Sequence, residues 1–130
     1  MSFHPRSRRM VRRSCSHSGR NHSALMRATF DGTGTPAVET VLRDGATNYH
    51  ATVSPDGAWL AYDSDRDGSR AVYVAQVDAR QPRKISGDGY AAVPQWSPDG
   101  RRLVFLKAER ARPRVWNVWV ADVATGSLHR

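Results

Sequence analysis

The sequence has a single cysteine, Cys15, in 130 residues. One cysteine cannot form an intramolecular disulfide, so the fold does not depend on an oxidising compartment. The sequence also lacks any apolar run near the roughly 18 residues that a membrane-spanning helix needs. Hydrophobic residues make up 39% of the chain and charged residues 25%, which is typical of a globular domain. We therefore expect a globular protein with no membrane span.

Acidic residues are missing from the first 23 positions, which hold six arginines. Residues 24–130 hold 14 lysines and arginines against 12 aspartates and glutamates, so most of the net charge of +8 lies in residues 1–23. We expect this segment to be a disordered, solvated tail. A nucleic-acid partner bound through the tail is a less favoured alternative, because a short arginine-rich segment binds phosphate non-specifically.

A recognisable export signal is also missing. Arg8 and Arg9 resemble the start of a twin-arginine motif, but the residues after Arg13 are polar. A signal peptide needs about 7–15 apolar residues at this point. As written, the chain is therefore expected to stay in the cytoplasm.

Motifs of common catalytic sites are not found either. The chain lacks G-x-S-x-G, H-E-x-x-H and a repeated C-x-x-C pattern, which mark hydrolase nucleophiles, zinc peptidases, and metal or redox sites. Its serines and histidines are scattered, and their pattern does not predict a nucleophile with a base and an orienting group. We expect a protein that is not an enzyme and that needs no cofactor.

What the sequence does contain is an internal repeat. The turn motif Ser-Pro-Asp-Gly occurs twice, 43 residues apart, as Ser54, Pro55, Asp56, Gly57 and Ser97, Pro98, Asp99, Gly100. Apolar runs around the two copies also align, 60–62 with 103–105, and 72–77 with 118–123 after a three-residue insertion. A period of about 40–45 residues with several short strands is typical of β-propeller blades.

The motif and its flanks predict antiparallel strands. Proline fixes φ, aspartate bonds nearby backbone and glycine accepts positive φ, so the motif favours a tight turn. The expected strands are 49–54, 58–64, 71–78 and 83–86 in the first copy, then 93–97, 101–107 and 115–123. Runs 72–75 and 103–106 are apolar without alternation, so these strands need cover on both faces. Stacked blades provide that cover.

The sequence thus predicts an all-β fold, a partial β-propeller made of four-stranded antiparallel blades. We place a basic tail at 1–23, the outer strands of a partial blade at 24–48, a complete blade at 49–91, and at 92–130 a second blade lacking most of its outer strand. A competing interpretation assigns residues 32–37 to a nucleotide-binding G-x-G-x-x-A loop that opens a helix. Alignment of Ala28 with Ala75, and of Leu42 with Ile85, favours two blade strands and a glycine-rich turn instead.

Residues 94–105 and 51–62 resemble the PD40 repeat of TolB-like propellers. The first segment reads Pro-Gln-Trp-Ser-Pro-Asp-Gly-Arg-Arg-Leu-Val-Phe, and the Gly-His and Trp-Asp dipeptides of WD40 repeats are missing. The resemblance covers residues 24–130. It implies a six-bladed bacterial periplasmic propeller that binds proteins and peptides in its channel. The same blades occur in prolyl-oligopeptidase-like peptidases and appended to bacterial transcription regulators.

From this resemblance we expect a non-catalytic module that binds a protein or peptide, as a truncated part of a larger propeller protein. The alternative is an accessory propeller domain of a prolyl-oligopeptidase-like peptidase or of a bacterial transcription regulator. The periplasmic location that the resemblance implies conflicts with the missing signal peptide. So few blades cannot close a ring, and self-association that completes the propeller is a further expectation.

Polar residues at first-strand positions are the candidate ligand contacts. His50, Thr52 and Gln95 are placed to face the central channel of a propeller. If they do not contact a ligand, they are solvated residues of the inner strands.

A calcium site is the weaker candidate. Asp63, Asp65 and Asp67 form the pattern D-x-D-x-D-G with Gly68, which begins a calcium loop. The twelfth position is Val74, where such a loop has a bidentate glutamate. A polar hairpin tip is therefore the favoured interpretation, and no metal is expected.

Overall fold

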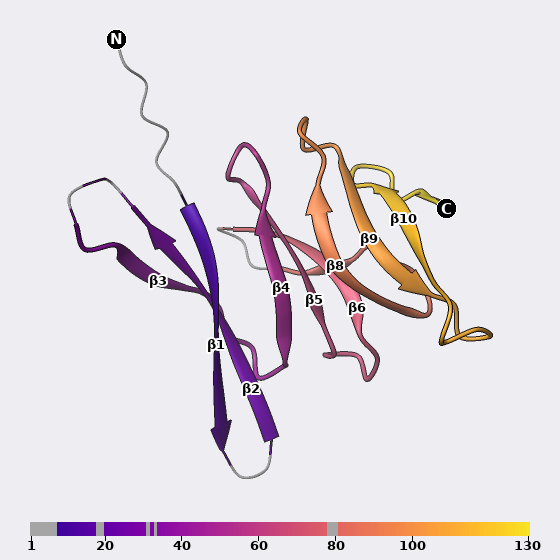
Figure 1. The fold of residues 1–130 in the computed structure, drawn as a ribbon, viewed down its shortest axis with the longest axis horizontal. Helices are drawn as coiled ribbons and strands as arrows, with labels where there is room; N and C mark the ends of the chain where they lie inside the picture. The colour runs from indigo at the N-terminus through magenta and orange to yellow at the C-terminus, as the bar shows by residue number, and fades with distance from the viewer. Residues whose placement is uncertain (1–7, 18–19, 31, 33, 78–80) are drawn as a thin grey trace.

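The computed structural model describes residues 8–17, 20–30, 32, 34–77 and 81–130, with side chains from residue 23 onward. Within these ranges eleven strands form three antiparallel sheets, which follow one another along the long axis of the molecule (Figure 1). None of the described segments is a helix that could cross a bilayer. The predicted all-β fold with four-stranded antiparallel blades is confirmed.

The strand order within each sheet is simple. The first sheet has the order β1 (Arg8–His17), β2 (Arg20–Thr29), β3 (Ala37–Leu42). The second has the order β4 (Asn48–Val53), β5 (Trp59–Ser64), β6 (Ala71–Gln76), β7 (Arg83–Lys84). The third has the order β8 (Tyr90–Trp96), β9 (Arg102–Ala108), β10 (Trp116–Asp122), β11 (Leu128–His129). Each neighbour in sequence is thus a neighbour in space, as in propeller blades.

The two Ser-Pro-Asp-Gly turns have the same hydrogen bonds. Ser54 Oγ donates to Asp56 Oδ1 over 2.5 Å and accepts from Trp59 N over 3.0 Å. Asp56 Oδ1 also accepts from Ala58 N, and Gly57 has a φ of 76° that a side chain would disfavour. These donors, the serine hydroxyl first, hold the pKa of the Asp56 carboxyl below its ordinary value.

The second turn repeats this arrangement through Ser97 and Asp99, whose Oγ–Oδ1 distance is 2.6 Å. Ser97 Oγ accepts from Arg102 N, and Asp99 Oδ1 accepts from Arg101 N. The pKa of Asp99 is lowered in the same way, mainly by the Ser97 hydroxyl. Both motifs are therefore self-contained turns that join the first two strands of a blade.

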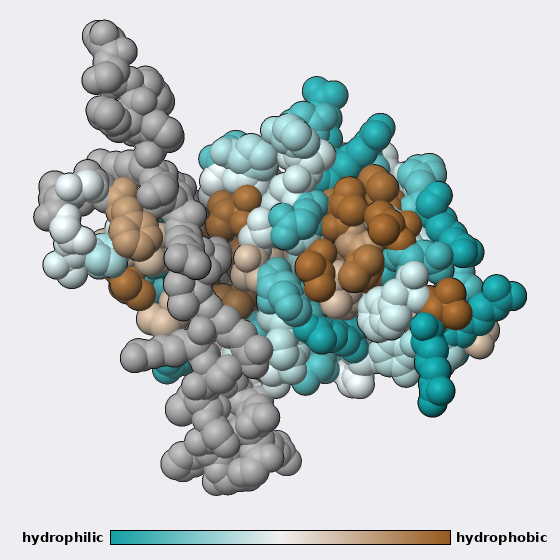
Figure 2. Space-filling model, in the orientation of Figure 1, coloured by the Kyte–Doolittle hydropathy of each residue, from teal (hydrophilic) through white to brown (hydrophobic). Residues whose placement is uncertain are grey.

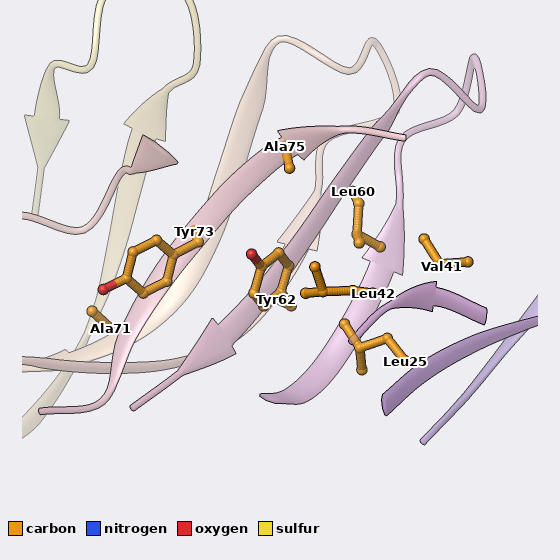
Figure 3. Packing of buried hydrophobic residues seen from close by; sticks show 8 residues of the cluster. All are labelled: Leu25, Val41, Leu42, Leu60, Tyr62, Ala71, Tyr73 and Ala75. Atoms are coloured by element: carbon orange, nitrogen blue, oxygen red, sulfur yellow. The ribbon is translucent and has the colours of Figure 1, made fainter. Parts of the chain in front are cut away.

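Apolar side chains between successive sheets form two cores. Between the first and second sheets, Leu25 and Leu42 lie against Leu60 and Tyr62, which are at most 6% exposed (Figure 3). The core between the second and third sheets is formed by buried apolar residues: Ala61, Val72, Val74, Ile85, Ala91, Leu103, Phe105 and Ala121. The middle sheet is covered on both faces, as its apolar strands require.

The N-terminal segment differs from the expected disordered tail, because Arg8–His17 forms β1. It pairs with β2 in an antiparallel hairpin, from Arg8 opposite Thr29 to His17 opposite Arg20. The backbone of β1 thereby satisfies the edge of β2 that faces away from β3. Edge strands tolerate charged residues, so the arginine content of this segment does not indicate whether it forms a strand. The first sheet therefore has three strands.

The glycine-rich segment joins two strands, as the alignment with the repeat predicts. Ala37–Leu42 is β3 and pairs antiparallel with β2, so the helix required by a nucleotide-binding loop does not form. At the other end, the outer strand of the third sheet is the two-residue β11, which pairs with β10 as the two-residue β7 pairs with β6. The exact blade boundaries remain predictions.

The third sheet has one uncovered apolar face. Val104, Leu106 and Val118 are 39%, 40% and 56% exposed, and Figure 2 has an apolar patch over this sheet. The equivalent positions of the second sheet include Ala61 and Val72, which are 0% exposed beneath the third sheet. The face of the second sheet that the third sheet buries thus has its equivalent on the third sheet, where it is exposed.

Candidate binding site on the inner strands

The first strands of the second and third sheets, β4 and β8, contact each other, and we call them the inner strands. Each carries a bulge at the same place in the repeat. In β4 the register shifts between Tyr49 and Thr52, and in β8 it shifts between Ala92 and Gln95. A bulge sets two residues of one strand against one of its neighbour and changes the direction of the side chains.

Both bulges contain a non-glycine residue in the left-handed region. His50 has a φ of 36° and Val93 a φ of 58°, and they are 43 residues apart in sequence. A β-branched residue such as valine is rarely found there. Backbone strain of this kind persists only where surrounding contacts hold it, and it is common at functional sites.

A buried carboxylate holds both bulges. Asp63, on β5, has a fully buried side chain. Its Oδ1 lies 3.0 Å from His50 Nδ1 and accepts a hydrogen bond from the backbone N–H of Val93 over 3.2 Å. Its Oδ2 accepts from Arg70 Nε. One side chain therefore connects the inner strand of its own blade with that of the next.

The charge of Asp63 is balanced by Arg70. The Arg70 guanidinium also lies 4.1 Å from the centroid of the Tyr49 ring, and its Nη2 is 3.1 Å from His50 Nδ1. A buried carboxylate without such partners would be strongly disfavoured. The His50 side chain is 49% exposed, so the cluster presents an imidazole to solvent while its anchoring carboxylate is shielded.

The structure places the three predicted contact residues on neighbouring strands. Thr52 and Gln95 occupy equivalent positions of β4 and β8. Thr52 is half-buried and its carbonyl accepts from Trp96 Nε1 over 3.2 Å, whereas Gln95 is exposed. His50, two residues before Thr52, belongs to the Asp63 cluster. That these three residues face a closed channel stays a prediction.

The three aspartates of the calcium pattern do not converge. Asp63 binds Arg70 and lies beside His50, Asp65 Oδ1 accepts from Thr47 N over 3.1 Å, and Asp67 accepts from the Tyr73 hydroxyl. No three acidic, histidine or cysteine side chains gather at a point in the part of the chain with described side chains. The chemistry of this segment is that of a turn and an ion pair.

Arg70, Tyr49 and Val93 are members of the cluster that sequence reasoning missed. One signal was available: Asp63 follows an apolar strand segment in which a charged residue needs a partner. The identity of that partner depends on the path of the loop before β6, which brings Arg70 next to Asp63 on β5. The Val93 contact crosses from one blade to the next.

Comparison with known proteins shows what the chain is similar to. No family model matches the chain. The Tol-Pal system protein TolB of Alcanivorax borkumensis is 37% identical over 68 residues, which are 51% of this chain and 16% of that protein. The uncharacterized peptidase YuxL of Bacillus subtilis is 40% identical over 53 residues, or 39% of this chain and 8% of that protein.

Solved structures agree on the fold. TolB from Acinetobacter baumannii superposes with a TM-score of 0.72 at 19% identity, over 92% of this chain and 29% of that one. The acylaminoacyl peptidase of Pyrococcus horikoshii has a TM-score of 0.65 at 14% identity, over 95% of this chain and 22% of that one. The segment of this chain that matches TolB from Alcanivorax borkumensis spans about one sixth of that protein's length. The repeat motif, the stacked sheets and these similarities show that the fold of this chain is that of the blades of TolB-like β-propellers.

Proposed function

We propose that this chain is a non-catalytic propeller module that binds a protein or peptide through its inner strands. The observation that carries the proposal is the pair of matched bulges at His50 and Val93, both tied to the buried Asp63. Strained backbone held in the same place of two blades is costly to maintain without a use.

The chemistry of this surface suits a peptide. The imidazole of His50 and the amide of Gln95 donate and accept hydrogen bonds, as the backbone of an extended peptide does. His50 is fixed from behind by Asp63, so little side-chain entropy is lost when a ligand binds. The sites lie on strands of two packed sheets, which positions them more rigidly than loops would.

A phage library of random dodecapeptides, selected on the full chain, tests this proposal. Selected peptides should bind the unaltered chain, lose about tenfold in affinity on Gln95→Ala or His50→Gln, and be unaffected by Lys84→Ala. Lys84 is the matched control because it is exposed on β7, the outer strand of the same sheet that contains β4. Equal binding by all variants would place the binding surface elsewhere.

An accessory domain of a peptidase is the second candidate function. It is favoured by the similarity to YuxL in sequence and to acylaminoacyl peptidase in fold. The parent gene distinguishes the two candidates. A hydrolase domain encoded in frame with this chain supports the accessory role, and its absence from the full-length parent protein supports the independent binding module.

Self-association is part of the proposal. The open face of the third sheet, with Val104, Leu106 and Val118, has the character of a blade interface. Burial of such a face by another copy releases apolar surface from water. Sedimentation velocity over a concentration series should reveal oligomers, and Val118→Asp should dissociate them. A monomer at every concentration contradicts this part of the proposal.

A further inference from the structure

A hollow lies between the second and third sheets, and no residue of the inner strands lines it. Its volume is about 590 Å³, and its walls include Trp59, Arg83, Arg101, Asp122 and Val123. Trp59 begins β5, Asp122 ends β10, and Arg101 follows the second Ser-Pro-Asp-Gly turn. The hollow is therefore at the end of the sheets where these turns lie. Cavities of this size are typical of ligand sites.

Contacts between the two sheets fix the walls of the hollow. Arg83 Nη2, on the outer strand of the second sheet, donates to the carbonyl of Val123 in the third sheet over 2.6 Å. The N–H of Val123 donates to the carbonyl of Arg101 over 3.0 Å. The position of Arg101 is thus set by the backbone, while its side chain is exposed.

The charges around the hollow favour an anion. Arg101 forms no ion pair with any residue whose side chain the structure describes. Asp122 is already engaged, because its Oδ1 accepts from Thr125 N over 2.9 Å. Hydrogen bonds from Thr125 hold the pKa of Asp122 below its ordinary value, so it stays ionised at neutral pH. The lining of the hollow thus has two guanidinium groups and one carboxylate, and Arg83 and Asp122 both already make hydrogen bonds within the protein, which leaves Arg101 for a ligand.

The remaining wall is apolar. The indole of Trp59 is half-buried, and Val123 packs at the margin of the core between the second and third sheets. An aromatic surface beside a guanidinium is a common arrangement for binding an aromatic group together with an anion.

We propose that this hollow is a second binding site, specific for a peptide segment in which a carboxylate adjoins an aromatic side chain. The carboxylate pairs with Arg101 and the aromatic ring lies against Trp59 and Val123. The site is separate from the inner strands, so it does not depend on His50 or Gln95 as contacts.

The tetrapeptide acetyl-Gly-Phe-Asp-Gly-amide is the probe, titrated into the ¹⁵N-labelled full chain. The four tryptophan indole N–H signals are followed by NMR, and those of Trp96, Trp116 and Trp119 serve as internal references. The Trp59 signal should shift and saturate. The neutral probe acetyl-Gly-Phe-Asn-Gly-amide should bind at least fivefold more weakly, since it lacks the charge that pairs with Arg101.

Arg101→Gln should weaken binding of the acidic probe about tenfold, whereas the matched variant Arg102→Gln should leave it within twofold. His50→Gln should also leave it within twofold, which separates this site from the inner-strand site. A Trp59 signal that does not respond to the probe overturns the proposal. Equal binding of the acidic and neutral probes, or equal loss in both arginine variants, overturns it as well.

Discussion

Replacement of Asp63 with asparagine should destabilise the fold through the inner-strand cluster. Asparagine has nearly the same shape, so the change removes the charge and one acceptor without opening a cavity. Breaking a buried ion pair costs about 3–5 kcal/mol when one charge is left buried. The Arg70 side chain is 35% exposed and is partly hydrated once unpaired, so we expect about 2–3 kcal/mol.

Urea unfolding followed by circular dichroism measures this cost. With a slope of about 2 kcal/mol per molar urea, the midpoint should fall by about 1–1.5 M. Asp88→Asn is the matched control, because Asp88 is exposed, and its midpoint should change by less than about 0.3 M. If Asp63→Asn shifts the midpoint no more than Asp88→Asn does, Asp63 does not hold the inner strands.

Three further results are expected. Gly89→Ala should lower the urea midpoint more than Gly45→Ala does. Both glycines have positive φ, but a Cβ at Gly89 would approach Ala108 O to 2.5 Å, whereas no atom beyond the adjacent residues lies within 4 Å of a Cβ at Gly45. Equal shifts of the midpoint would refute the close contact. Burial raises the pKa of Tyr62 to about 12, so its stabilising effect is complete below pH 10 and is lost between about pH 10 and 12; Tyr62→Phe should make unfolding in that range less steep in pH, and an unchanged profile would argue against burial of the hydroxyl. The Tyr62 hydroxyl has no hydrogen-bond partner among the described residues, so Tyr62→Phe should leave the urea midpoint at pH 7 unchanged or raise it, and a loss above about 1 kcal/mol would reveal a bond.

The blade pattern could be predicted because its information is local. The Ser54 and Ser97 turns contain their own hydrogen bonds, and the apolar runs beside them repeat at a fixed period. The position of β1 could not be predicted, because strand pairing depends on the partner β2 and the arginine content of the segment masks it.

The candidate site was predictable only in part. His50, Thr52 and Gln95 could be chosen as polar residues on first strands. The cluster that fixes His50 could not, because Asp63, Arg70 and Val93 meet through a loop, a bulge and a contact between blades. Such contacts depend on three-dimensional packing rather than on residue spacing.

The proposed binding surface on the inner strands is tested most directly by site-specific photocrosslinking. A p-benzoylphenylalanine at position 95 or at position 84, in otherwise unaltered full chains, is irradiated with a peptide selected on the unaltered chain. Position 95 lies on the inner strand β8 and position 84 on the outer strand β7. The account predicts a crosslink from position 95 and none from position 84. Crosslinking from position 84 alone, or equally from both, would contradict it.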